Sequence, residues 1–541
     1  MNFIQPAPQL ADPYRDDRVL QSWLARVLPE VQRRAAEPDF VALAEYAQRV
    51  YARQVTTPPT EPVLTRWDVW GNRVDRVGLT ETWREGPAIA AKFGLVADGH
   101  DRALGEFARV QQFAKVYLYH AASAFYSCPL AMTDGVATTL RDAPNVALRD
   151  RVLPHLLSRD PATFWISGQW MTENTGGSDV GGSETAARRD SDGTWRLNGR
   201  KWFTSAINAE VALALARPEG NPGGADGLAL FCVETRNADG SWNGITLDRL
   251  KDKLGTRELP TAEIHLHDTR AELVGDTRHG VRAIAPVLQV TRLWNAFGSL
   301  STMARCLALA RDYARRRPAF GKRLIEQPLF ADSLAGWEAE FEAAFHLAME
   351  VALLLGCVES GTVDARDASL QRLLTPLAKL WICKLGVRIA SETVEAFGGI
   401  GYLEDSGIPL LLRDAQVFPI WEGASNVQAL DFLRALDKLG IDSVVEAVDA
   451  WMEDGDGAVS DAESIHGAIR HADTWLRDHA RDGDALQAGA LRLGTTCARA
   501  VAAALLARHA AWARRQQGDS VSANALRRFC AHGLDRIIEA A

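Results

Sequence analysis

Apolar residues at helical spacing fill most of the first 165 residues. The segments VLQSWLARVL, FVALAEYAQRVYARQ and EFARVQQFAKVYLYHAASAFY repeat apolar side chains every three or four positions, which is the period of one helix face. From about residue 166 the pattern changes to short runs such as TWRLNGRKWF, LALFCVET and AEIHLHD, separated by Gly, Asn and Asp. Such runs between turn residues predict a compact β domain over residues 166–278.

Helical spacing returns near residue 280. We expect long helices from Val281 to Arg317, over 329–359 and over 366–396, and a shorter one after Ser425. Four helices of this kind predict a bundle over residues 279–440, and residues 441–541 form a further helical extension. The predicted fold is therefore α+β: an N-terminal α domain (1–165), a central β barrel or sandwich (166–278), a four-helix bundle (279–440) and an extra helical domain (441–541).

The helix after Ser425 has the clearest pattern. Its apolar residues recur every three positions and predict one buried stripe, made of Val427, Leu430, Leu433, Leu436 and Leu439. Ser425 followed by Gln428 fits a capping box, which makes Ser425 the expected N-cap. Glu422 then lies in the loop just before this helix. On these residues alone it is either a surface carboxylate near the positive helix end or a functional acid.

Composition narrows the class of protein. The 541 residues carry a net charge of −9, which argues against a chain that coats nucleic acid or anionic membrane over its whole surface. The seven cysteines are scattered singly, as in a reduced cytoplasmic protein. We find no secretory signal and no apolar stretch of about 18 residues that would span a membrane. The expected location is cytoplasmic.

Several familiar sites are absent from the sequence. There is no P-loop motif, and GGIGY at 398–402 follows a helix rather than a strand, so a Rossmann site is poorly supported. His265 and His267 alternate on a predicted strand without further ligands at metal spacing. We interpret them as part of a surface strand and predict no metal site.

Three segments have the composition of a binding site. WMTENTGGSDV at 170–180 is a Gly-rich loop whose hydroxyl and backbone N–H groups can hold phosphate or a polar ring edge. GRKWFTSA at 199–206 places two aromatics before Thr204 and Ser205, a wall for a flat heteroaromatic. Arg317, in RRRPAFGKRLIEQPLF, can pair with a pyrophosphate. Taken singly, each also fits an ordinary turn, a plain strand or a solvated helix face.

Together, five motifs resemble the acyl-CoA dehydrogenase family in order and spacing: QWMTENTGGSDV, GRKWFTSA, RRRPAFGKRL, EAFGGIGYLED and LLRDAQVFPIWEGASNVQ. The resemblance covers about residues 80–440. The N-terminal segment TTPPTEPVLTRWDVWGNRVDRVGLTETW and the helical extension are similar to the AidB-type branch, flavoproteins of the bacterial alkylation response. The resemblance implies an FAD-dependent oxidoreductase acting on acyl-CoA, and a homotetramer.

The resemblance also implies which residues meet FAD. The loop at the flavin ring and pyrophosphate is matched by Gln169, Met171, Thr172, Gly177 and Ser178. The strand beside the isoalloxazine is matched by Phe203, Thr204 and Ser205. The segments that reach FAD from a neighbouring subunit are matched by Arg317, Phe320, Gln327, Glu395, Gly398 and Gly399. The residues around the catalytic loop that contact the cofactor are Trp421, Gly423 and Asn426.

Glu422 matches the catalytic base of the family, which removes an α-proton from the acyl thioester while the β-hydride goes to flavin N5. The isovaleryl-type branch takes its base from the residue before an Arg on the long helix, but here that residue is Thr291, before Arg292, and Thr cannot act as a base. Arg292 and Trp294 are the candidate substrate residues. The bulky Trp294, Asn295 and Phe297 predict a short or branched acyl group.

Departures from the family pattern lead to a second hypothesis. In the Gly-rich loop, Asn-Thr-Gly replaces the usual Pro-Gly-Ala of the family. Phe203 stands where a Trp is usual, and Ala424 stands where a Thr is common. These three differences argue against efficient turnover. Residues 485–541 hold 8 Arg against 3 acidic residues, and such a cluster can neutralise DNA phosphates. The alternative is a flavoprotein that binds double-stranded DNA without sequence preference through Arg508, Arg514, Arg515, Arg527 and Arg528. The sequence identifies no electron acceptor.

Overall fold

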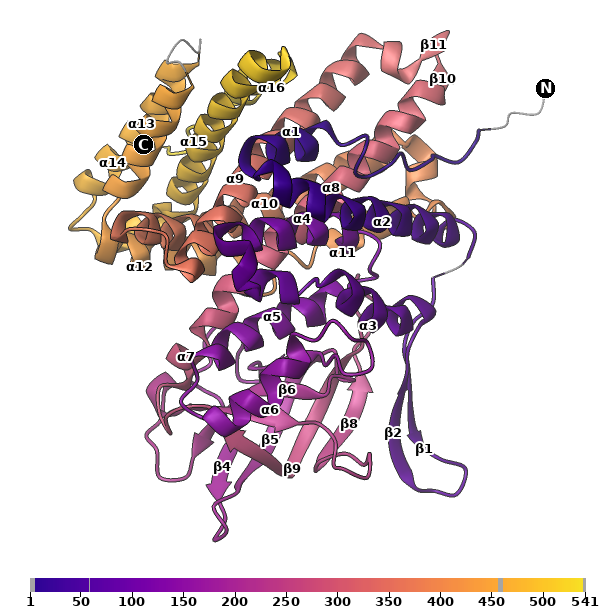
Figure 1. Ribbon diagram of the computed structural model, residues 1–541, viewed down its shortest axis with the longest axis vertical. Helices are drawn as coiled ribbons and strands as arrows, with labels where there is room; N and C mark the ends of the chain where they lie inside the picture. Colours follow the sequence, from indigo (N-terminus) through magenta and orange to yellow (C-terminus); the bar gives the residue numbers. More distant parts are fainter. Residues whose placement is uncertain (1–4, 58, 456–460, 539–541) are drawn as a thin grey trace. The chain divides into compact units, whose positions relative to one another are not determined.

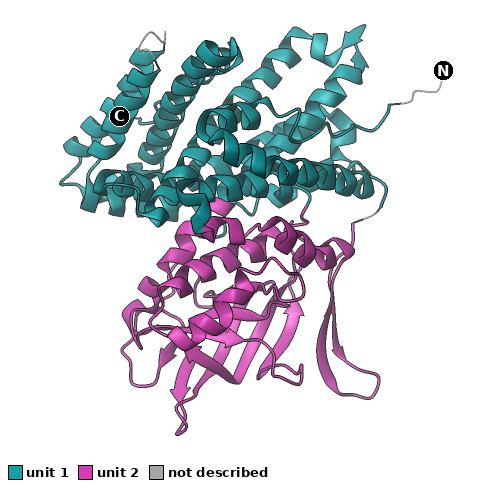
Figure 2. Cartoon of the chain, in the orientation of Figure 1, with its two compact units in different colours: residues 1–58, 102–122, 295–541 teal, residues 59–101, 123–294 magenta. Residues whose placement is uncertain are grey.

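The computed structural model describes residues 5–57, 59–455 and 461–538, and the chain forms two compact units (Figure 2). Unit 1 comprises residues 1–58, 102–122 and 295–541, and unit 2 comprises residues 59–101 and 123–294. The N-terminal helical region of residues 1–165 therefore contributes to both units. The candidate site residues also fall in both units.

A closed β barrel forms the centre of unit 2 (Figure 1). Strand β6 pairs in parallel with β3 and β4 and antiparallel with β7. Strand β5 lies between β4 and β9 and is antiparallel to both. Strand β9 also pairs antiparallel with β7 and β8. The barrel closes because β7 pairs with both β9 and β6. The strands are β3 (Ser167–Trp170), β4 (Ala186–Arg189), β5 (Trp195–Ser205), β6 (Val211–Pro218), β7 (Ala229–Glu234), β8 (Ile245–Leu250) and β9 (Thr261–Leu273).

Strand β6 shows how sequence alternation builds two cores. Ala212, Ala214 and Ala216 face one core, where small side chains leave room for Trp170 and Phe231. The alternate residues, Val211, Leu213 and Leu215, face a second core against helices. Both faces of this strand are buried, which explains its continuous apolar run.

Helices and one hairpin complete unit 2. The second core packs β6 against α5 (Ser127–Arg141) and α6 (Val146–Leu156), and the remaining helices are α3 (Glu81–Phe93), α7 (Gly280–Ala283) and the start of α8 (Ala285–Arg316). The hairpin of β1 (Val63–Trp67) and β2 (Arg73–Gly78) interrupts a region predicted to be mostly helical. Asp68 makes its turn by accepting hydrogen bonds from the N–H groups of Trp70 and Asn72, a role for which Asp is well suited.

Unit 1 is helical, and its long helices confirm the sequence prediction. Its elements are α1 (Arg18–Val27), α2 (Glu30–Gln54), α4 (Ala108–His120), most of α8, α9 (Pro328–Ser360), α10 (Ala365–Ala396), α11 (Ile408–Ala415), α12 (Ser425–Leu439), α13 (Asp442–Asp454), α14 (Ala462–Asp478), α15 (Gly483–Gln517) and α16 (Val521–Ala531). A tight hairpin, β10 (Pro318–Ala319) with β11 (Lys322–Arg323), separates α8 from α9.

The detailed prediction for α12 was wrong in two respects. The N-cap is Ala424, which offers no side-chain acceptor, so Ser425 and Gln428 do not form a capping box. The buried face also differs from the predicted stripe, since it consists of Ser425, Gln428, Ala429, Asp431, Phe432, Ala435 and Leu436. An α-helix has 3.6 residues per turn, so a strict three-residue repeat winds around the helix and leaves Leu439 exposed.

Ion pairs join the C-terminal extension to the bundle. Arg499 of α15 pairs with Glu340 of α9 at 2.8 Å, with both side chains almost fully buried, and Arg508 pairs with Glu350 at 2.6 Å. Helices α9 and α15 are long and apolar enough to cross a membrane, but 83% of the most apolar window of each is buried. These two helices therefore form protein core. All seven cysteines are free thiols, as predicted.

Candidate active site

Strand β5 presents two aromatic rings at a bulge. The register of β5 against β9 shifts between Lys201 and Thr204, and the intervening Phe203 is 47% exposed. The Lys251 ammonium lies 3.6 Å from the centre of the Trp202 ring and 4.3 Å from that of Phe203, a distance at which cation–π attraction holds the rings. Both rings of the predicted wall therefore lie beside Lys251, and Phe203 is the more exposed of the two, while their role beside a cofactor stays a prediction.

The two hydroxyls after this wall differ in their surroundings. Thr204 is fully buried and donates a hydrogen bond to the Ala262 carbonyl at 2.7 Å. Ser205 is half-buried, with its hydroxyl 3.1 Å from that of Thr261. The Thr204 side chain is thus used inside the sheet, and Phe203 and Ser205 are the side chains of this predicted group that a ligand can reach.

The Gly-rich loop begins at the end of β3. The Trp202 N–H donates to the Thr172 carbonyl at 2.9 Å, which fixes the loop entrance beside the aromatic wall. Gly177 and Ser178 are exposed. Among the described residues, the buried Oε1 of Gln169 has no hydrogen-bond partner. A buried amide oxygen without a donor is costly, so this atom fits the N–H edge of a bound flavin ring, and the neighbouring residues fit the group.

The predicted substrate residues lie on α8 within unit 2. Trp294 is buried and donates its indole N–H to Asp134 at 2.7 Å, and the other oxygen of Asp134 lies 2.8 Å from Nε2 of His100. Arg292 is also buried. Trp294 is therefore held in one orientation by an acid and does not lie loosely at a pocket mouth.

In unit 1, the loop before α12 holds Glu422 in an uncommon backbone conformation. Glu422 has φ +56° and Gly423 has φ +95°. Left-handed backbone is rare for a residue with a side chain and persists where the surroundings enforce it. A Cβ at position 423 would lie 2.7 Å from Nε2 of Gln428, so the second position requires glycine.

Two side chains enforce this conformation through backbone carbonyls. Nε2 of Gln428 donates to the carbonyls of Glu422 at 2.8 Å and Gly423 at 3.2 Å. The buried Lys379 of α10 donates to the Gly423 carbonyl at 2.5 Å. The Glu422 side chain is half-buried, and Trp421 and the exposed Asn426 lie on either side of the loop. The motifs of the sequence do not include Lys379, although a lysine inside the apolar run LLTPLAKLWICK is a signal for a buried polar role.

The six residues predicted to reach FAD from a neighbouring subunit line one open cavity of about 1010 Å³. Arg317, Phe320 and Gln327 come from the segment between α8 and α9, and Glu395, Gly398 and Gly399 come from the end of α10. Phe320 is 98% exposed at the tip of the β10–β11 hairpin. Although some seventy residues separate them in sequence, the two segments line the same cavity, and their contact with FAD stays a prediction.

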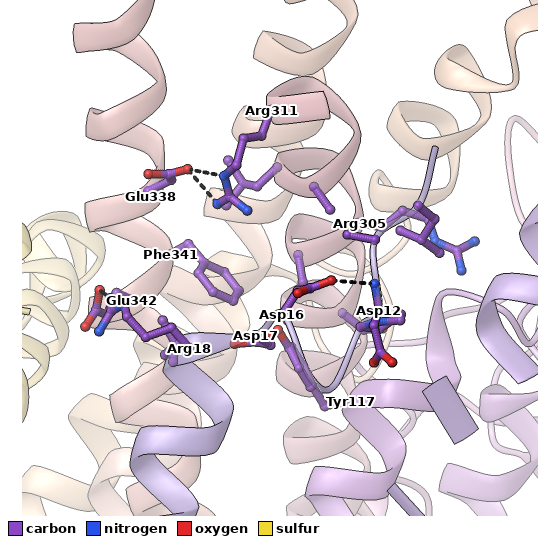
Figure 3. Close-up of a pocket in the computed structure, with 18 of the residues that line it drawn as sticks. Asp12, Asp16, Asp17, Arg18, Tyr117, Arg305, Arg311, Glu338, Phe341 and Glu342 are labelled. Atoms are coloured by element: carbon purple, nitrogen blue, oxygen red, sulfur yellow. Dashed lines mark hydrogen bonds and ion pairs between the residues drawn. The ribbon is translucent and has the colours of Figure 1, made fainter. Parts of the chain in front are cut away.

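A second cavity, of about 470 Å³, lies between the N-terminal segment, α8 and α9 (Figure 3). Its lining includes two ion pairs and a hydrogen bond: Glu338 accepts from Arg311 at 2.6 Å, Glu342 accepts from Arg18, and Asp17 accepts from the Tyr117 hydroxyl at 2.5 Å. Of the predicted site residues, only Arg528 lines it. We assign this cavity no function.

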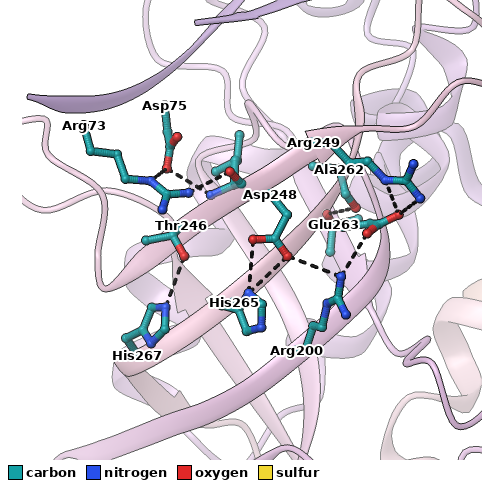
Figure 4. A network of polar contacts seen from close by, with 12 residues as sticks. Arg73, Asp75, Arg200, Thr246, Asp248, Arg249, Ala262, Glu263, His265 and His267 are labelled. Atoms are coloured by element: carbon teal, nitrogen blue, oxygen red, sulfur yellow. Dashed lines mark hydrogen bonds and ion pairs between the residues drawn. The ribbon is translucent and has the colours of Figure 1, made fainter. Parts of the chain in front are cut away.

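The histidine pair on β9 belongs to a polar network on the barrel surface (Figure 4). Nδ1 of His265 lies 3.1 Å from Asp248, and Nε2 of His267 lies 3.1 Å from the Thr246 hydroxyl. Nearby, Glu263 accepts from Arg249 and Lys251. The interpretation as a surface strand is confirmed.

The five arginines of the predicted DNA-binding cluster differ in their exposure and in their ion pairs. Arg508 is mostly buried in its pair with Glu350, and Arg528 pairs with Asp332 at 2.6 Å. Arg514, Arg515 and Arg527 are exposed. Arg508 was therefore a wrong choice for a phosphate contact, because its guanidinium serves the docking of α15.

Comparison with known proteins accounts for nearly the whole chain. The family model for the AidB N-terminal domain matches residues 5–160, that for the acyl-CoA dehydrogenase middle domain matches 168–269, and that for the C-terminal domain matches 278–436. Acyl-CoA dehydrogenase family member 11 of Caenorhabditis elegans is 39% identical over 535 residues, covering 94% of this chain and 86% of the relative. The chain belongs to the AidB-type acyl-CoA dehydrogenase family.

Other members of the AidB-type family agree in sequence and structure. Putative acyl-CoA dehydrogenase AidB of Escherichia coli is 36% identical, covering 70% of this chain and 69% of the relative. The crystal structure of C. elegans ACDH-11 in complex with C11-CoA has a TM-score of 0.94 at 36% identity and covers 100% of this chain and 94% of that one. The structure of Bd2924 in its apo form has a TM-score of 0.88 at 41% identity, covering 94% and 100%.

Membership in the AidB-type family settles the chemical class and the cofactor. The fold is that of the acyl-CoA dehydrogenases, with an N-terminal helical domain, a closed β barrel and a C-terminal helical domain. The family consists of FAD-dependent oxidoreductases that act on acyl-CoA. The chain is therefore an FAD-dependent oxidoreductase.

Proposed function

We propose that this chain dehydrogenates an acyl-CoA thioester at its α and β carbons, with Glu422 as the catalytic base. The observation that carries this proposal is the backbone of the Glu422–Gly423 loop, which is held in the left-handed region by Lys379 and Gln428. Such an arrangement fixes the direction in which the Glu422 side chain leaves the backbone, and the position of a base relative to the substrate determines whether a weakly acidic α-proton is removed.

The proposed roles follow from the chemistry of each group. Glu422 takes the α-proton, and a preorganised N–H donor near the thioester oxygen stabilises the negative charge that develops there. Bound FAD supplies the acceptor for the β-hydride. Phe203 covers one face of the ring site, and the amide of Gln169 meets its polar edge. Gly177, Ser178 and Thr172 leave room for the phosphates.

Two hypotheses remain for the acyl chain. The sequence predicts a short or branched chain because Trp294 and Phe297 are bulky, and Phe297 is fixed by stacking on Phe113 with ring centres 4.7 Å apart. The ACDH-11 complex with C11-CoA supports a chain of medium length. The two hypotheses differ in which acyl-CoA reduces the flavin.

We further propose that the active form is a homotetramer in which the open cavity is closed by another copy of the chain. Phe320 and Leu329 line this cavity and are 98% and 80% exposed. Large apolar side chains gathered at one exposed site mark an interface. Because the cavity also holds Arg317, closing it places a cation where the pyrophosphate of FAD requires one.

An anaerobic titration tests the proposed reaction. Purified protein loaded with FAD is mixed with acyl-CoAs of short, branched and medium chains while the visible absorbance is followed. We expect bleaching of the flavin with one chain class, which also names the substrate. A flavin spectrum that no acyl-CoA bleaches would contradict the proposed dehydrogenation.

The alternative function, binding of double-stranded DNA, now rests on Arg514, Arg515 and Arg527, which are exposed. It predicts an affinity that falls steeply between low and physiological salt. The triple variant R514A/R515A/R527A should then bind DNA more weakly at every salt concentration. Full affinity in this variant would exclude the arginine cluster as the DNA site.

A further inference from the structure

Beside the proposed flavin site, unit 2 contains a buried ion pair that the proposed chemistry does not use. Nζ of Lys201 lies 2.6 Å from Oε1 of Glu173, and the two side chains are 0% and 4% exposed. Burying two charges is costly unless further hydrogen bonds complete the arrangement. The surroundings of this pair supply them.

Glu173 connects the two ends of the Gly-rich loop. At the start of the loop its N–H and carbonyl exchange hydrogen bonds with Gly176. Its carboxylate accepts from the N–H of Glu184 at 2.7 Å and from the Thr185 hydroxyl at 2.6 Å, where the loop ends and β4 begins. Through its backbone and its carboxylate, this one residue therefore holds both ends of the segment from Glu173 to Thr185.

Lys201 connects this loop to the barrel. It lies on β5, and besides Glu173 its ammonium donates to the Leu215 carbonyl on β6 at 2.7 Å. The loop entrance, the loop exit, β5 and β6 therefore converge on one buried ion pair. Each of its members is also next in sequence to a residue at the proposed flavin site: Thr172 precedes Glu173, and Trp202 and Phe203 follow Lys201.

The protonation state agrees with this geometry. Burial alone would raise the pKa of Glu173, but the Lys201 ammonium and hydrogen bonds from Thr185 and the Glu184 N–H lower it below its usual value. Burial lowers the pKa of Lys201, and the Glu173 carboxylate opposes that change. Glu173 is thus ionised at neutral pH and its oxygens are occupied by donors, so it has a structural role and is a poor base.

We propose that Glu173 and Lys201 are positioning residues of the flavin site, which hold the Gly-rich loop at a fixed distance from the aromatic wall of β5. The inference rests on the proposed function, since it takes Thr172 and Phe203 as flavin contacts. A loop ordered in advance binds its ligand more tightly because less order must be gained on binding. The pair thus preorganises the site without touching the cofactor.

The test compares FAD affinity in the full-length chain and in two variants, E173Q and K201M. Each variant is first checked for cooperative thermal unfolding, and FAD is then titrated by its fluorescence and by the visible circular dichroism of the bound flavin. We expect the Kd for FAD to rise about 10-fold or more, as when a supporting residue behind a binding site is lost, and the flavin dichroism to change. An unchanged Kd and dichroism in both folded variants would overturn the proposal.

The matched control is E340Q. Glu340 is equally buried in an ion pair, with Arg499 of α15, but it lies in unit 1 on α9. E340Q should lower the unfolding temperature without changing the Kd for FAD. A rise in Kd equal to that of E173Q would show that general destabilisation accounts for the effect, and would overturn the positioning role.

A measurement on the unaltered chain covers the case in which the variants do not fold. Amide hydrogen exchange at Glu184, Thr185 and Trp202 is compared before and after FAD is added. Because binding and loop order are linked reciprocally, FAD should slow exchange at these amides. If the chain binds FAD and the exchange does not change, the positioning role is excluded. A chain that takes up no FAD would instead contradict the proposed function and, with it, any role of the pair in positioning flavin.

Discussion

Glu173, in the Gly-rich loop of unit 2, and Glu422, in the loop before α12 of unit 1, are held in different ways. Glu173 is almost fully buried, with its carboxylate saturated by Lys201, Thr185 and backbone N–H groups. Glu422 is half-buried, and the structure fastens its loop through the carbonyls of Glu422 and Gly423. The Glu173 side chain is thus held through its carboxylate oxygens, whereas the backbone of the Glu422 loop is held through two of its carbonyls. The sequences TEN and WEG do not reveal this difference.

The comparison predicts a separation of effects between the two loops. Replacing Lys379 by Met removes the donor to the Gly423 carbonyl and lets the loop shift. We expect the rate of anaerobic flavin reduction to fall about 10²-fold, because small misplacements of a catalytic group have effects of this size. The rise in the Kd for FAD should be smaller than in the E173Q variant, since Gly423 is one predicted FAD contact among many.

The control for Lys379 is Lys384, which lies on the same helix and is exposed. K384M should reduce the flavin at the rate of the unaltered chain. Both measurements use stopped-flow absorbance with saturating acyl-CoA. If K379M raised the Kd for FAD and left the reduction rate unchanged, the assignment of Lys379 to the catalytic loop would be wrong.

Acid should loosen the region of the Glu422 loop before that of the Glu173 loop. The ring of His120 lies 5.4 Å from that of Phe418, four residues before Glu422. Burial lowers the pKa of His120 to about 3, with a smaller contribution from Arg305. The unfolded chain takes up this proton near pH 6.5, so stability is lost as the pH falls from 6.5 toward 3 and is constant above 6.5. The pKa of Glu173 is lowered, so its contribution persists to more acid pH.

Urea unfolding at pH 7.5 and pH 5.0 measures this effect. At pH 5.0 the solution is about 1.5 units below the unfolded pKa of His120, so at 1.36 kcal/mol per unit this residue alone lowers the free energy of unfolding by about 2 kcal/mol. Burial also lowers the pKa values of His346 and His509, which add to the total loss. The H120Q variant should lack the His120 part of the pH dependence, whereas H265Q, on the barrel surface, should retain it. Equal pH dependence in H120Q and the unaltered chain would show that His120 does not titrate in this way.

The smallest expected effect concerns the start of α12. Because Ala424 is the N-cap and Ser425 lies within the helix, S425A should change the free energy of unfolding by less than about 0.5 kcal/mol. Asp364 is a true N-cap that accepts from the Asp367 N–H at 2.9 Å, so D364A should cost about 1 kcal/mol. If S425A lowered the free energy of unfolding by about 1 kcal/mol, Ser425 would act as an N-cap and the capping box would be the correct interpretation.

The sequence predicted the helices well because their apolar spacing is long and regular. It missed the β1–β2 hairpin, whose short strands expose Trp67 and depend on the turn made by Asp68. It also placed the start of α12 one residue late, because Gln428 matches a capping partner in sequence but turns back to the carbonyls of Glu422 and Gly423. Local patterns do not determine which of two competing hydrogen bonds a side chain makes.

For the candidate site, the resemblance to the acyl-CoA dehydrogenase family identified residues that local sequence patterns could only suggest. The meeting of Arg317 with Glu395 in one cavity depends on the packing of α8 and α10, which no local signal encodes. The roles of Lys201 and Lys379 were not predicted either. A lysine within an apolar segment marks a buried polar contact, but its partner becomes known only when the chain is folded.

The most direct test of the central claim is anaerobic mixing of acyl-CoA with the E422Q variant, which keeps the size of the side chain and removes its basicity. The account predicts that E422Q retains a full complement of FAD and an unchanged flavin spectrum. It also predicts that flavin bleaching becomes slower by about 10³-fold or more, as for loss of a general base. Bleaching of E422Q at the rate of the unaltered chain would show that another group removes the α-proton.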